Sequence, residues 1–172
     1  MSSDAPEDRR GSVTADDFRR ACGRFATGIT VASVTDPQGM PHGLTVNSFT
    51  SVSLQPPLIL FALSHSASVF DAFRDAQYFA INVLSSHQRE LSDRFARKGE
   101  DRFDGLEWHT GETGVPLLDH TVAEIECQVR YRFPAGDHDL LVGEMVRAVV
   151  HEGDPLVYFG GRYRKLGALE IE

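Results

Sequence analysis

Cysteine is scarce in this chain, which has only Cys22 and Cys127. Two cysteines so far apart in sequence predict neither a disulfide scaffold nor a cysteine-based zinc site, and they fit a reducing compartment. Long hydrophobic runs are also missing, because the longest, Leu58–Leu63, is six residues whereas a membrane-spanning helix needs about 20. No apolar run follows the polar N-terminal residues. We therefore expect no secretory signal, no membrane association and a cytoplasmic location.

Positive charge is in deficit. The chain has 17 Lys and Arg against 25 Asp and Glu, which gives a formal net charge of -8. This charge repels a polyanion such as DNA, so no nucleic-acid partner is expected. A phosphate-bearing ligand would have to be bound by backbone N–H groups, hydroxyls and a few local Arg or Lys side chains.

Several motifs of known chemistry are absent. The chain has no G-x-G-x-x-G and no G-x-x-x-x-G-K-[ST], which are the glycine fingerprints of nucleotide-binding parallel sheets. It has no G-x-S-x-G elbow to support serine hydrolysis. Its histidines have no second His or Cys at ligand spacing, so no metal is predicted.

The composition that remains is that of one soluble globular domain of 172 residues, 41% of them hydrophobic and 24% charged. We expect residues 1–13 to form a disordered tail and residues 14–172 a single domain. Thr14 and Asp17 make an imperfect capping box. Behind it, an amphipathic helix is predicted by the helical spacing of Phe18, Ala21, Cys22 and Phe25. Cys22 would be buried on this helix, and Cys127 in a strand.

Short apolar and β-branched segments separated by turns predict about seven strands. They are expected at Ile29–Thr35, Gly43–Phe49, Leu58–Leu63, Tyr78–Leu84, Glu124–Phe133, Leu140–Val150 and Leu156–Phe159. Leu58–Leu63 is apolar throughout, which predicts a central strand buried on both faces. A short helix capped by Ser66 or Ser68 and a helix over Gln88–Ala96 are also expected. Since strands and helices do not alternate regularly, the pattern favours a closed or nearly closed antiparallel barrel, mainly β with a few helices.

The segment Glu124–Phe133 alternates cleanly between apolar and polar residues. One face, expected to be buried, would have Ile125, Cys127, Val129, Tyr131 and Phe133, and the solvent face would include Glu124 and Glu126. Gly143 is expected to mark a bulge in the next strand. Arg97–His120 is polar, Gly-rich and without a clear period, and its length favours a functional loop.

Hydroxyl and amide side chains are concentrated in Gly43–Ser53. One interpretation is an edge strand whose polar face meets solvent. The other is a site for an amphipathic heterocycle, whose polar edge would be matched by Thr45, Asn47 and Ser48 while its faces rest on apolar side chains. The pattern leaves both interpretations open.

Five groups of residues, taken in order and at their separations, make a specific match to a known family. They are Thr27–Val31, Ser48–Leu54 running into Pro56–Leu58, Asn82–Leu84, Gly136–His138, and Pro155–Phe159 followed by Gly161 and Tyr163. With these, the chain resembles the short-chain flavin reductases that serve two-component flavin-dependent monooxygenases, from about Phe18 to Leu166. The resemblance implies the antiparallel, FMN-binding split β-barrel of that family.

The same resemblance implies where flavin binds. The isoalloxazine edge and ribityl chain would lie against Pro41, His42, Gly43, Leu44, Thr45, Asn47 and Ser48, with Ala62, Leu63 and Ser64 beside them. The phosphate end would meet Ala67 and Ser68 at a helix start, together with Arg94 and Phe95. A helix N-terminus and an arginine both favour an anion.

For the nicotinamide dinucleotide, the resemblance implies contacts with His138 and with Tyr158, Phe159, Gly160 and Gly161. A histidine can donate to the carboxamide or to a phosphate, and the two glycines permit close backbone approach. Asp137 would either orient the imidazole or make an ordinary Asx turn.

The predicted activity is therefore NAD(P)H:flavin oxidoreductase, with FMN or FAD as the flavin and NADH or NADPH as co-substrate. No catalytic acid or base is obligatory, since hydride passes between the two cofactors. The resemblance further implies a homodimer and a separate monooxygenase that receives reduced flavin by diffusion. The alternatives are a non-catalytic split-barrel carrier or sensor of flavin or haem, and a barrel without a ligand.

Overall fold

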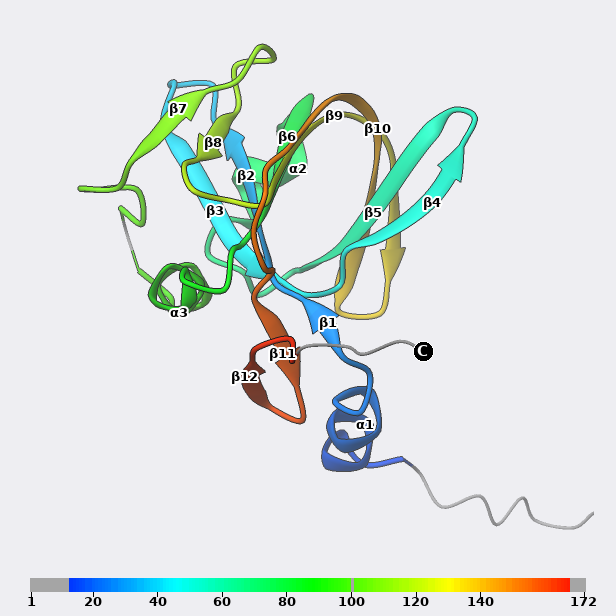
Figure 1. Cartoon of the computed structure of the whole chain (residues 1–172). Helices are drawn as coiled ribbons and strands as arrows, with labels where there is room; N and C mark the ends of the chain where they lie inside the picture. The colour runs from blue at the N-terminus through cyan, green and yellow to red at the C-terminus, as the bar shows by residue number, and fades with distance from the viewer. Residues whose placement is uncertain (1–12, 100, 168–172) are drawn as a thin grey trace, which may run out of the picture.

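The computed structural model describes residues 13–99 and 101–167. Within these residues, seven strands form one antiparallel sheet in the order β3-β2-β6-β9-β10-β5-β4, which curls into an open barrel with β3 and β4 at its edges (Figure 1). The strands are β2 (Thr30–Thr35), β3 (Pro41–Val46), β4 (Thr50–Leu54), β5 (Pro57–Ser64), β6 (Tyr78–Val83), β9 (Ala123–Ala135) and β10 (His138–Val150). The predicted fold class, mainly β with a split antiparallel barrel, is confirmed. The predicted tail lies outside the described residues, apart from Val13.

Two smaller sheets and three helices complete the described part of the chain. One sheet contains β1 (Thr27–Gly28), β11 (Val157–Phe159) and β12 (Arg162–Arg164), and the other pairs β7 (Trp108–Thr110) with β8 (Pro116–Leu118). The helices are α1 (Ala15–Cys22), α2 (Phe70–Asp75) and α3 (Arg89–Ala96). None of the described helices is long and apolar enough to cross a bilayer.

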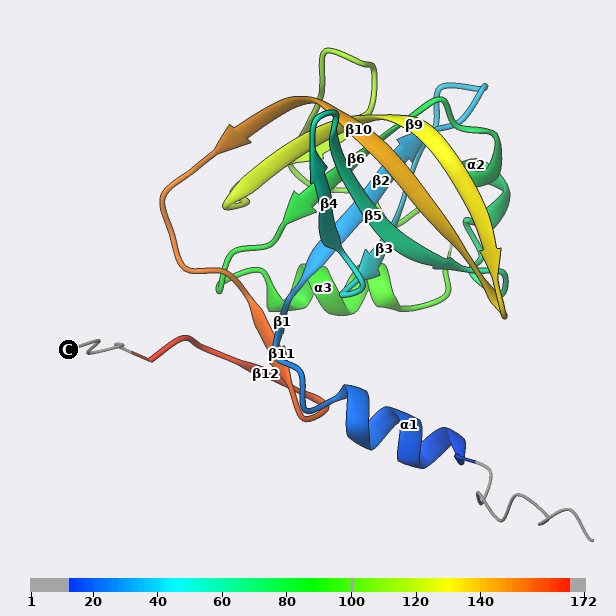
Figure 2. The same cartoon turned by 90° about the vertical axis from the view of Figure 1, so that its right-hand side faces the viewer.

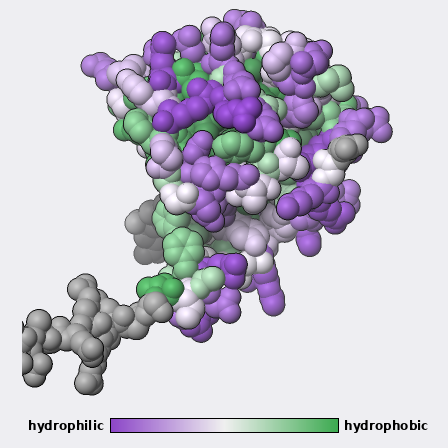
Figure 3. Space-filling model, turned by 180° about the vertical axis from the view of Figure 1, so that it is seen from behind, coloured by the Kyte–Doolittle hydropathy of each residue, from purple (hydrophilic) through white to green (hydrophobic). Residues whose placement is uncertain are grey.

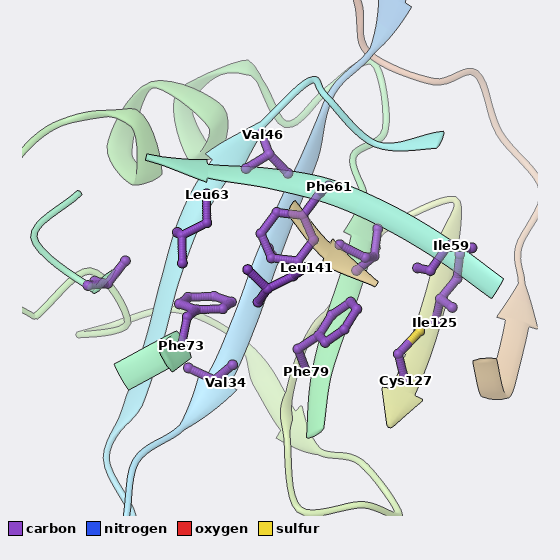
Figure 4. Close-up of a cluster of buried hydrophobic side chains, with 13 residues drawn as sticks. Val34, Val46, Ile59, Phe61, Leu63, Phe73, Phe79, Ile125, Cys127 and Leu141 are labelled. Atoms are coloured by element: carbon purple, nitrogen blue, oxygen red, sulfur yellow. The ribbon is translucent and has the colours of Figure 1, made fainter. Parts of the chain in front are cut away.

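The barrel core is built on an aromatic cluster (Figure 4). The ring of Phe61 on β5 meets Phe73 and Phe79 edge-on, with centroids 5.9 and 5.3 Å apart. Along β5, buried residues alternate with half-buried ones, so only one face of the strand enters this core. The prediction that Leu58–Leu63 is a central strand buried on both faces is wrong, because the residues of its second face are only half-buried and β5 is the last strand before the edge strand β4.

A second core lies between the barrel and α3. Phe95 of α3 is buried and packs on β3 at Gly43, where an added Cβ would lie 2.7 Å from the Phe95 ring. Phe95 also meets Phe103 edge-on, with centroids 5.0 Å apart. The absence of a side chain at Gly43 therefore lets α3 approach the sheet.

A bulge on β9 changes which residues face the core. In the pairing with β10, Val142 lies opposite Tyr131 and Gly143 opposite Val129, so Arg130 is an extra residue on β9. Beyond this extra residue, the side chains of β9 that would have faced the core face outward, and the reverse. Tyr131 and Phe133 are exposed and stacked, whereas Arg132 donates to the Phe73 carbonyl of α2 and to that of its C-cap, Ala76. The pairing does shift register beside Gly143, but the extra residue lies on β9 and not, as predicted, at Gly143 itself. The prediction that Tyr131 and Phe133 continue the buried face is wrong.

The glutamates of β9 are buried rather than exposed. Glu124 and Glu126 retain 6% and 1% of their accessible surface, so their predicted place on a solvent face is wrong. The β7–β8 hairpin covers them and belongs to the stretch expected to be a loop. Glu126 accepts hydrogen bonds from Thr113 N and Oγ1, at 2.7 and 2.6 Å.

Helix α1 stands away from the barrel, beside the β11–β12 hairpin (Figures 1 and 2). It begins at the predicted Thr14–Asp17 capping box, which is complete. None of its residues is buried, and Phe18 is 63% exposed. Cys127 is buried as expected, but Cys22 is exposed, because no part of the described chain covers the apolar stripe of α1. Figure 3 shows hydrophobic surface at this lower end of the molecule.

Candidate active site

The end of β5 brings two groups of predicted site residues together. Ser64, expected near the flavin, lies directly opposite His138, expected near the nicotinamide, in the β5–β10 pairing. His65 N donates to Asp137 O at 3.0 Å and fixes the turn beside them. Of the neighbouring residues, Leu63 points into the core and Ala62 is half-buried. This edge of the barrel therefore gathers residues that are 74 positions apart in the chain.

The loop after β3 reaches the same edge. The Ser48 hydroxyl accepts a hydrogen bond from Ala62 N at 3.0 Å, which ties the loop to β5. Thr45 Oγ1 donates to Ser92 O of α3 at 2.7 Å. Asn47 is exposed and its amide makes no hydrogen bond within the described residues. The amide is thus free to meet the polar edge of a ligand, while the Ser48 hydroxyl ties the loop to β5 and the Thr45 hydroxyl ties β3 to α3.

A small hollow opens between β3, β5 and α3. Its volume is about 210 Å³. We call it the α3 hollow, and the predicted residues that line it are Leu44, Thr45, Ser64, Ala67, Ser68 and Phe95. Lys98 and Arg102 supply its positive charge. The predicted helix cap is wrong, because the N-cap of α2 is Val69 and no side chain bonds there. Ser68 is instead available to other partners.

A larger space, the β3 cavity, lies on the other side of Arg102. It measures about 550 Å³, and its walls include Met40, Pro41, His42, Gly43, Ser68 and Val69. His42 Nε2 lies 2.7 Å from Asp36 Oδ2. The bond from His42, with that from Met40 N, holds the pKa of Asp36 below its usual value. Pro41, His42 and Gly43 thus line a space adjoining the α3 hollow.

Arg102 was missed by the sequence analysis. Its Nη1 donates to the Gly43 carbonyl and its Nη2 to Ser68 Oγ at 2.9 Å, while its buried Nε has no partner in the described structure. Burial lowers the pKa of this guanidinium. The only sequence signal was its position within the polar stretch Arg97–His120.

The predicted phosphate residue Arg94 is placed elsewhere. Its Nη2 donates to the Asp104 carbonyl, and its side chain lines a separate surface hollow with Glu90, Asp93 and Arg97. The structure therefore does not bring Arg94 to the α3 hollow, although its helix neighbour Phe95 lines that hollow.

The remaining nicotinamide candidates lie on the β11–β12 hairpin. The ring of Tyr158 packs on Tyr163, Phe159 lies under Arg24, and Gly160 N donates to Gly23 O at 2.8 Å. Both glycines of the turn have positive φ, 60° for Gly160 and 77° for Gly161, which favours glycine there. Figure 2 shows this hairpin apart from the turn between β9 and β10, where His138 lies. Within one chain, the candidates on the β11–β12 hairpin and His138 therefore do not form one site.

The titratable and metal-ligating groups of the described chain suggest neither a nucleophile nor a metal site. His138 Nδ1 lies 2.7 Å from Asp137 Oδ1, and this hydrogen bond lowers the pKa of Asp137. Burial raises the pKa of the Cys127 thiol to about 12, so it is no nucleophile at neutral pH. Among residues 13–99 and 101–167, no cluster of His, Cys, Asp and Glu could hold a metal ion.

Comparison with known proteins gives a consistent result. Residues 22–167 match the family described as flavin reductase like domain. The chain is 47% identical over 153 residues to an FMN reductase (NADH), SmoA, of Agrobacterium fabrum, covering 89% of this chain and 87% of that protein.

Two solved structures share the fold, with about a third of the aligned sequence identical. The NADH:FAD oxidoreductase SgcE6 of Streptomyces globisporus, in complex with NAD and FAD fragments, superposes with a TM-score of 0.84 at 36% identity, covering 88% of this chain and 92% of that one. BorF, the flavin reductase component of a bacterial two-component tryptophan halogenase, gives a TM-score of 0.83 at 34% identity, covering 91% and 100%.

Proposed function

Because the chain belongs to the flavin reductase like family, we propose that it is an NAD(P)H:flavin oxidoreductase that reduces FMN or FAD and supplies reduced flavin to a separate monooxygenase. The observation that carries this proposal is the pairing of Ser64 with His138 across β5 and β10. It puts residues expected at the flavin beside a residue expected at the nicotinamide. Relatives named as NADH-dependent FMN and FAD reductases support the same reaction.

The residues present fit a phosphate-bearing heterocycle. The free Asn47 amide and the backbone around Ser64 offer a polar edge, and the buried Arg102 Nε without a partner offers a cation for the other end. When bound, flavin and nicotinamide supply the bond chemistry, which is hydride transfer from nicotinamide C4 to flavin N5. The protein orients the two rings, excludes water and provides backbone dipoles.

His138 is proposed to position the nicotinamide. In the neutral imidazole, the carboxylate of Asp137 holds the proton on Nδ1, which leaves Nε2 as an acceptor for the carboxamide N–H₂. His138→Ala is therefore expected to raise the KM for NADH about tenfold while flavin affinity stays unchanged. An unchanged KM would remove His138 from the site.

A homodimer is proposed because the described chain leaves apolar strand residues uncovered. Leu54 on the edge strand β4 is 90% exposed and Val150 on β10 is 81% exposed. A second copy that covers such residues could also bring its β11–β12 hairpin to the His138 turn. Light scattering after size exclusion tests this, and a monomer at micromolar concentration would contradict it. A cytoplasmic location is proposed from the two free cysteines and the need for NAD(P)H.

The activity is tested by mixing the protein with FMN or FAD and with NADH or NADPH. Steady loss of the near-ultraviolet absorbance of reduced nicotinamide, in the presence of excess flavin, is the expected result. A flavin spectrum that shifts without turnover would support a carrier or sensor instead. Coupling to a flavin-dependent monooxygenase then tests whether the reduced flavin leaves the protein.

A further inference from the structure

We propose that a hollow between the β6–α3 loop, the β7–β8 hairpin and the segment after β10 binds a linear polyamine through its ammonium groups. We call it the acidic hollow. Its volume is about 1060 Å³, and none of the predicted flavin or nicotinamide residues lines it. The inference therefore goes beyond the proposed function and does not depend on it.

The charge of the acidic hollow is the first argument. No Lys or Arg is among the described residues that line it, so no fixed positive charge is present there. Its titratable residues are four carboxylates and four histidines, namely Asp119, Glu124, Glu152 and Asp154 with His87, His109, His120 and His151. Where the histidines are neutral, the carboxylates are uncompensated and attract a cation.

The bonding of Glu124 is the second argument. Its side chain keeps 7% of its accessible surface, and its only hydrogen bond within the described residues is with His151 Nε2, at 3.4 Å. His109 Nε2 lies 3.6 Å from the other carboxylate oxygen. However, His109 Nδ1 is 2.8 Å from Asp119 Oδ1, and the one proton of a neutral imidazole belongs on this shorter contact. Glu124 is therefore a buried carboxylate short of donors, which is unfavourable unless a cation joins it.

An unpaired hydroxyl is the third and independent argument. Thr121 also lines the acidic hollow and is 3% exposed. Its Oγ1 is buried and has no hydrogen-bond partner within the described residues. Because buried polar groups are nearly always paired, an unpaired one in the lining of a hollow points to a group added from outside.

These groups select an ammonium. A primary ammonium has a positive charge and three N–H donors, so it offers Glu124 the charge and donors that it lacks and gives Thr121 a partner. A metal ion does not fit, because no group of His, Cys, Asp and Glu in the described ranges 13–99 and 101–167 is placed to hold one. The hollow is too large for one ammonium ion, and its carboxylates come from three segments, so a chain with several ammonium groups matches it.

The walls of the acidic hollow are tied together by hydrogen bonds to backbone carbonyls. Gln88 Nε2 donates to Asp119 O at 2.7 Å, and Ser86 N donates to Asp154 O at 2.8 Å. Two of the carboxylate residues are thus fixed to the β6–α3 loop. Little ordering of the protein is then needed when a ligand binds, which favours affinity.

Isothermal titration calorimetry of the full chain with spermidine tests the proposal, in about 0.15 M NaCl so that weak surface attraction is screened. We expect one spermidine per chain and a higher melting temperature in its presence. Glu124→Gln keeps the shape of the side chain but removes its charge, and should weaken spermidine binding at least about tenfold. Thr121→Val should weaken it about two- to tenfold.

The matched control is Glu144→Gln, which removes the same charge from the pair with Arg130, outside the acidic hollow. It should bind spermidine like the parent protein. Equal losses in Glu124→Gln and Glu144→Gln would show a general attraction to the net charge of -8 and overturn the proposal. Equal stabilisation of the parent by Mg²⁺, a cation without N–H donors, would also overturn it.

A second variant keeps the test decisive if Glu124→Gln does not fold. Glu152→Gln combined with Asp154→Asn changes only exposed side chains and should weaken spermidine binding at least about fivefold. Unchanged affinity in this double variant would contradict the proposal, as would a parent protein that shows neither heat of binding nor a shift in melting temperature with spermidine.

The same ammonium chemistry is present in a lysine side chain. Nα-acetyl-lysine amide, which has a single ammonium, should bind at least about tenfold more weakly than spermidine. Equal affinity would assign the acidic hollow to a lysine of a protein and make the polyamine assignment wrong. Failure of flavin reduction would leave the result of each of these titrations unchanged, so the two proposals are tested separately.

Discussion

Two inward-facing charges, Glu126 under the β7–β8 hairpin and Arg102 beside β3, are treated differently by the fold. Glu126 accepts hydrogen bonds from Thr113 N, Thr113 Oγ1 and Glu112 N, and Arg147 Nη1 lies 3.5 Å away. Gly111 lets the chain wrap closely, since a Cβ there would lie 2.7 Å from the carboxylate. Arg102 keeps a donor without a partner. The chain itself saturates the charge of Glu126, whereas Arg102 retains bonding capacity that, in the proposed function, a phosphate would use.

The largest expected effect is on Glu126. Glu126→Ala should lower the free energy of unfolding by about 3 kcal/mol, because it leaves the Thr113 and Glu112 donors unpaired under the hairpin. Urea unfolding measures this. Glu107→Ala, at an exposed pair with His120, should change stability by less than about 0.5 kcal/mol. A loss below about 1 kcal/mol for Glu126→Ala would break the contrast with Arg102.

The pH dependence of stability sharpens the same point. Burial alone would raise the pKa of Glu126, but the bonds from Thr113 and Glu112 and the charge of Arg147 outweigh it and hold the pKa below its usual value. The carboxylate therefore stabilises the fold above the unfolded pKa of about 4.3, and this is lost as pH falls through the folded pKa. The advantage of the parent over Glu126→Gln should shrink below about pH 4.3. An advantage independent of pH from neutral to acid would contradict it.

A smaller effect is expected at Gly43, whose carbonyl accepts from Arg102. Gly43→Ala should cost about 1–3 kcal/mol, because its Cβ would press on the ring of Phe95. Flavin affinity should fall as well, since the Arg102 acceptor moves. Gly28→Ala is the control, because its Cβ meets nothing within 4 Å. If Gly43→Ala had the same free energy of unfolding as the parent protein, α3 would be able to move away from the added methyl group.

The smallest effect is expected at Arg102 itself. Arg102→Met removes a charge that lacks an anion and keeps most of the side-chain volume, so unfolding in phosphate-free, flavin-free buffer should change by less than about 1 kcal/mol. Added FMN should then stabilise the parent more than the variant. If Arg102→Met were as unstable as Glu126→Ala, the two charges would have the same role.

Most strands could be predicted from the sequence, because the spacing of apolar residues that identifies a strand is a local pattern. The β9 pattern identified a strand but could not show that a hairpin covers its polar side, so Glu124 and Glu126 were assigned to solvent. That hairpin and Arg102 both lie in the stretch Arg97–His120, which has little periodicity. The position of Arg102 depends on Phe103 packing with Phe95 of α3, a contact across the stretch after that helix, which has no period that would report it.

For the candidate site, the resemblance supplied what periodicity could not. It selected Ser64 and His138, which the β5–β10 register then placed opposite each other. It also selected Arg94, which shares α3 with Phe95 but points to a different surface hollow. Resemblance to a family can therefore identify a residue, but the packing of the structure decides which way its side chain points.

The extra residue at Arg130 limits how the β9–β10 hairpin can change length. Side chains along a strand alternate, so a single insertion or deletion beyond the bulge would exchange the two faces, and a pair would restore them. An odd change would turn the aromatic rings of Tyr131 and Phe133 inward and release Arg132 from the Phe73 carbonyl. We therefore expect insertions or deletions in the β9–β10 hairpin beyond Arg130 to come in pairs of residues, because only these keep His138 on the same face of the barrel.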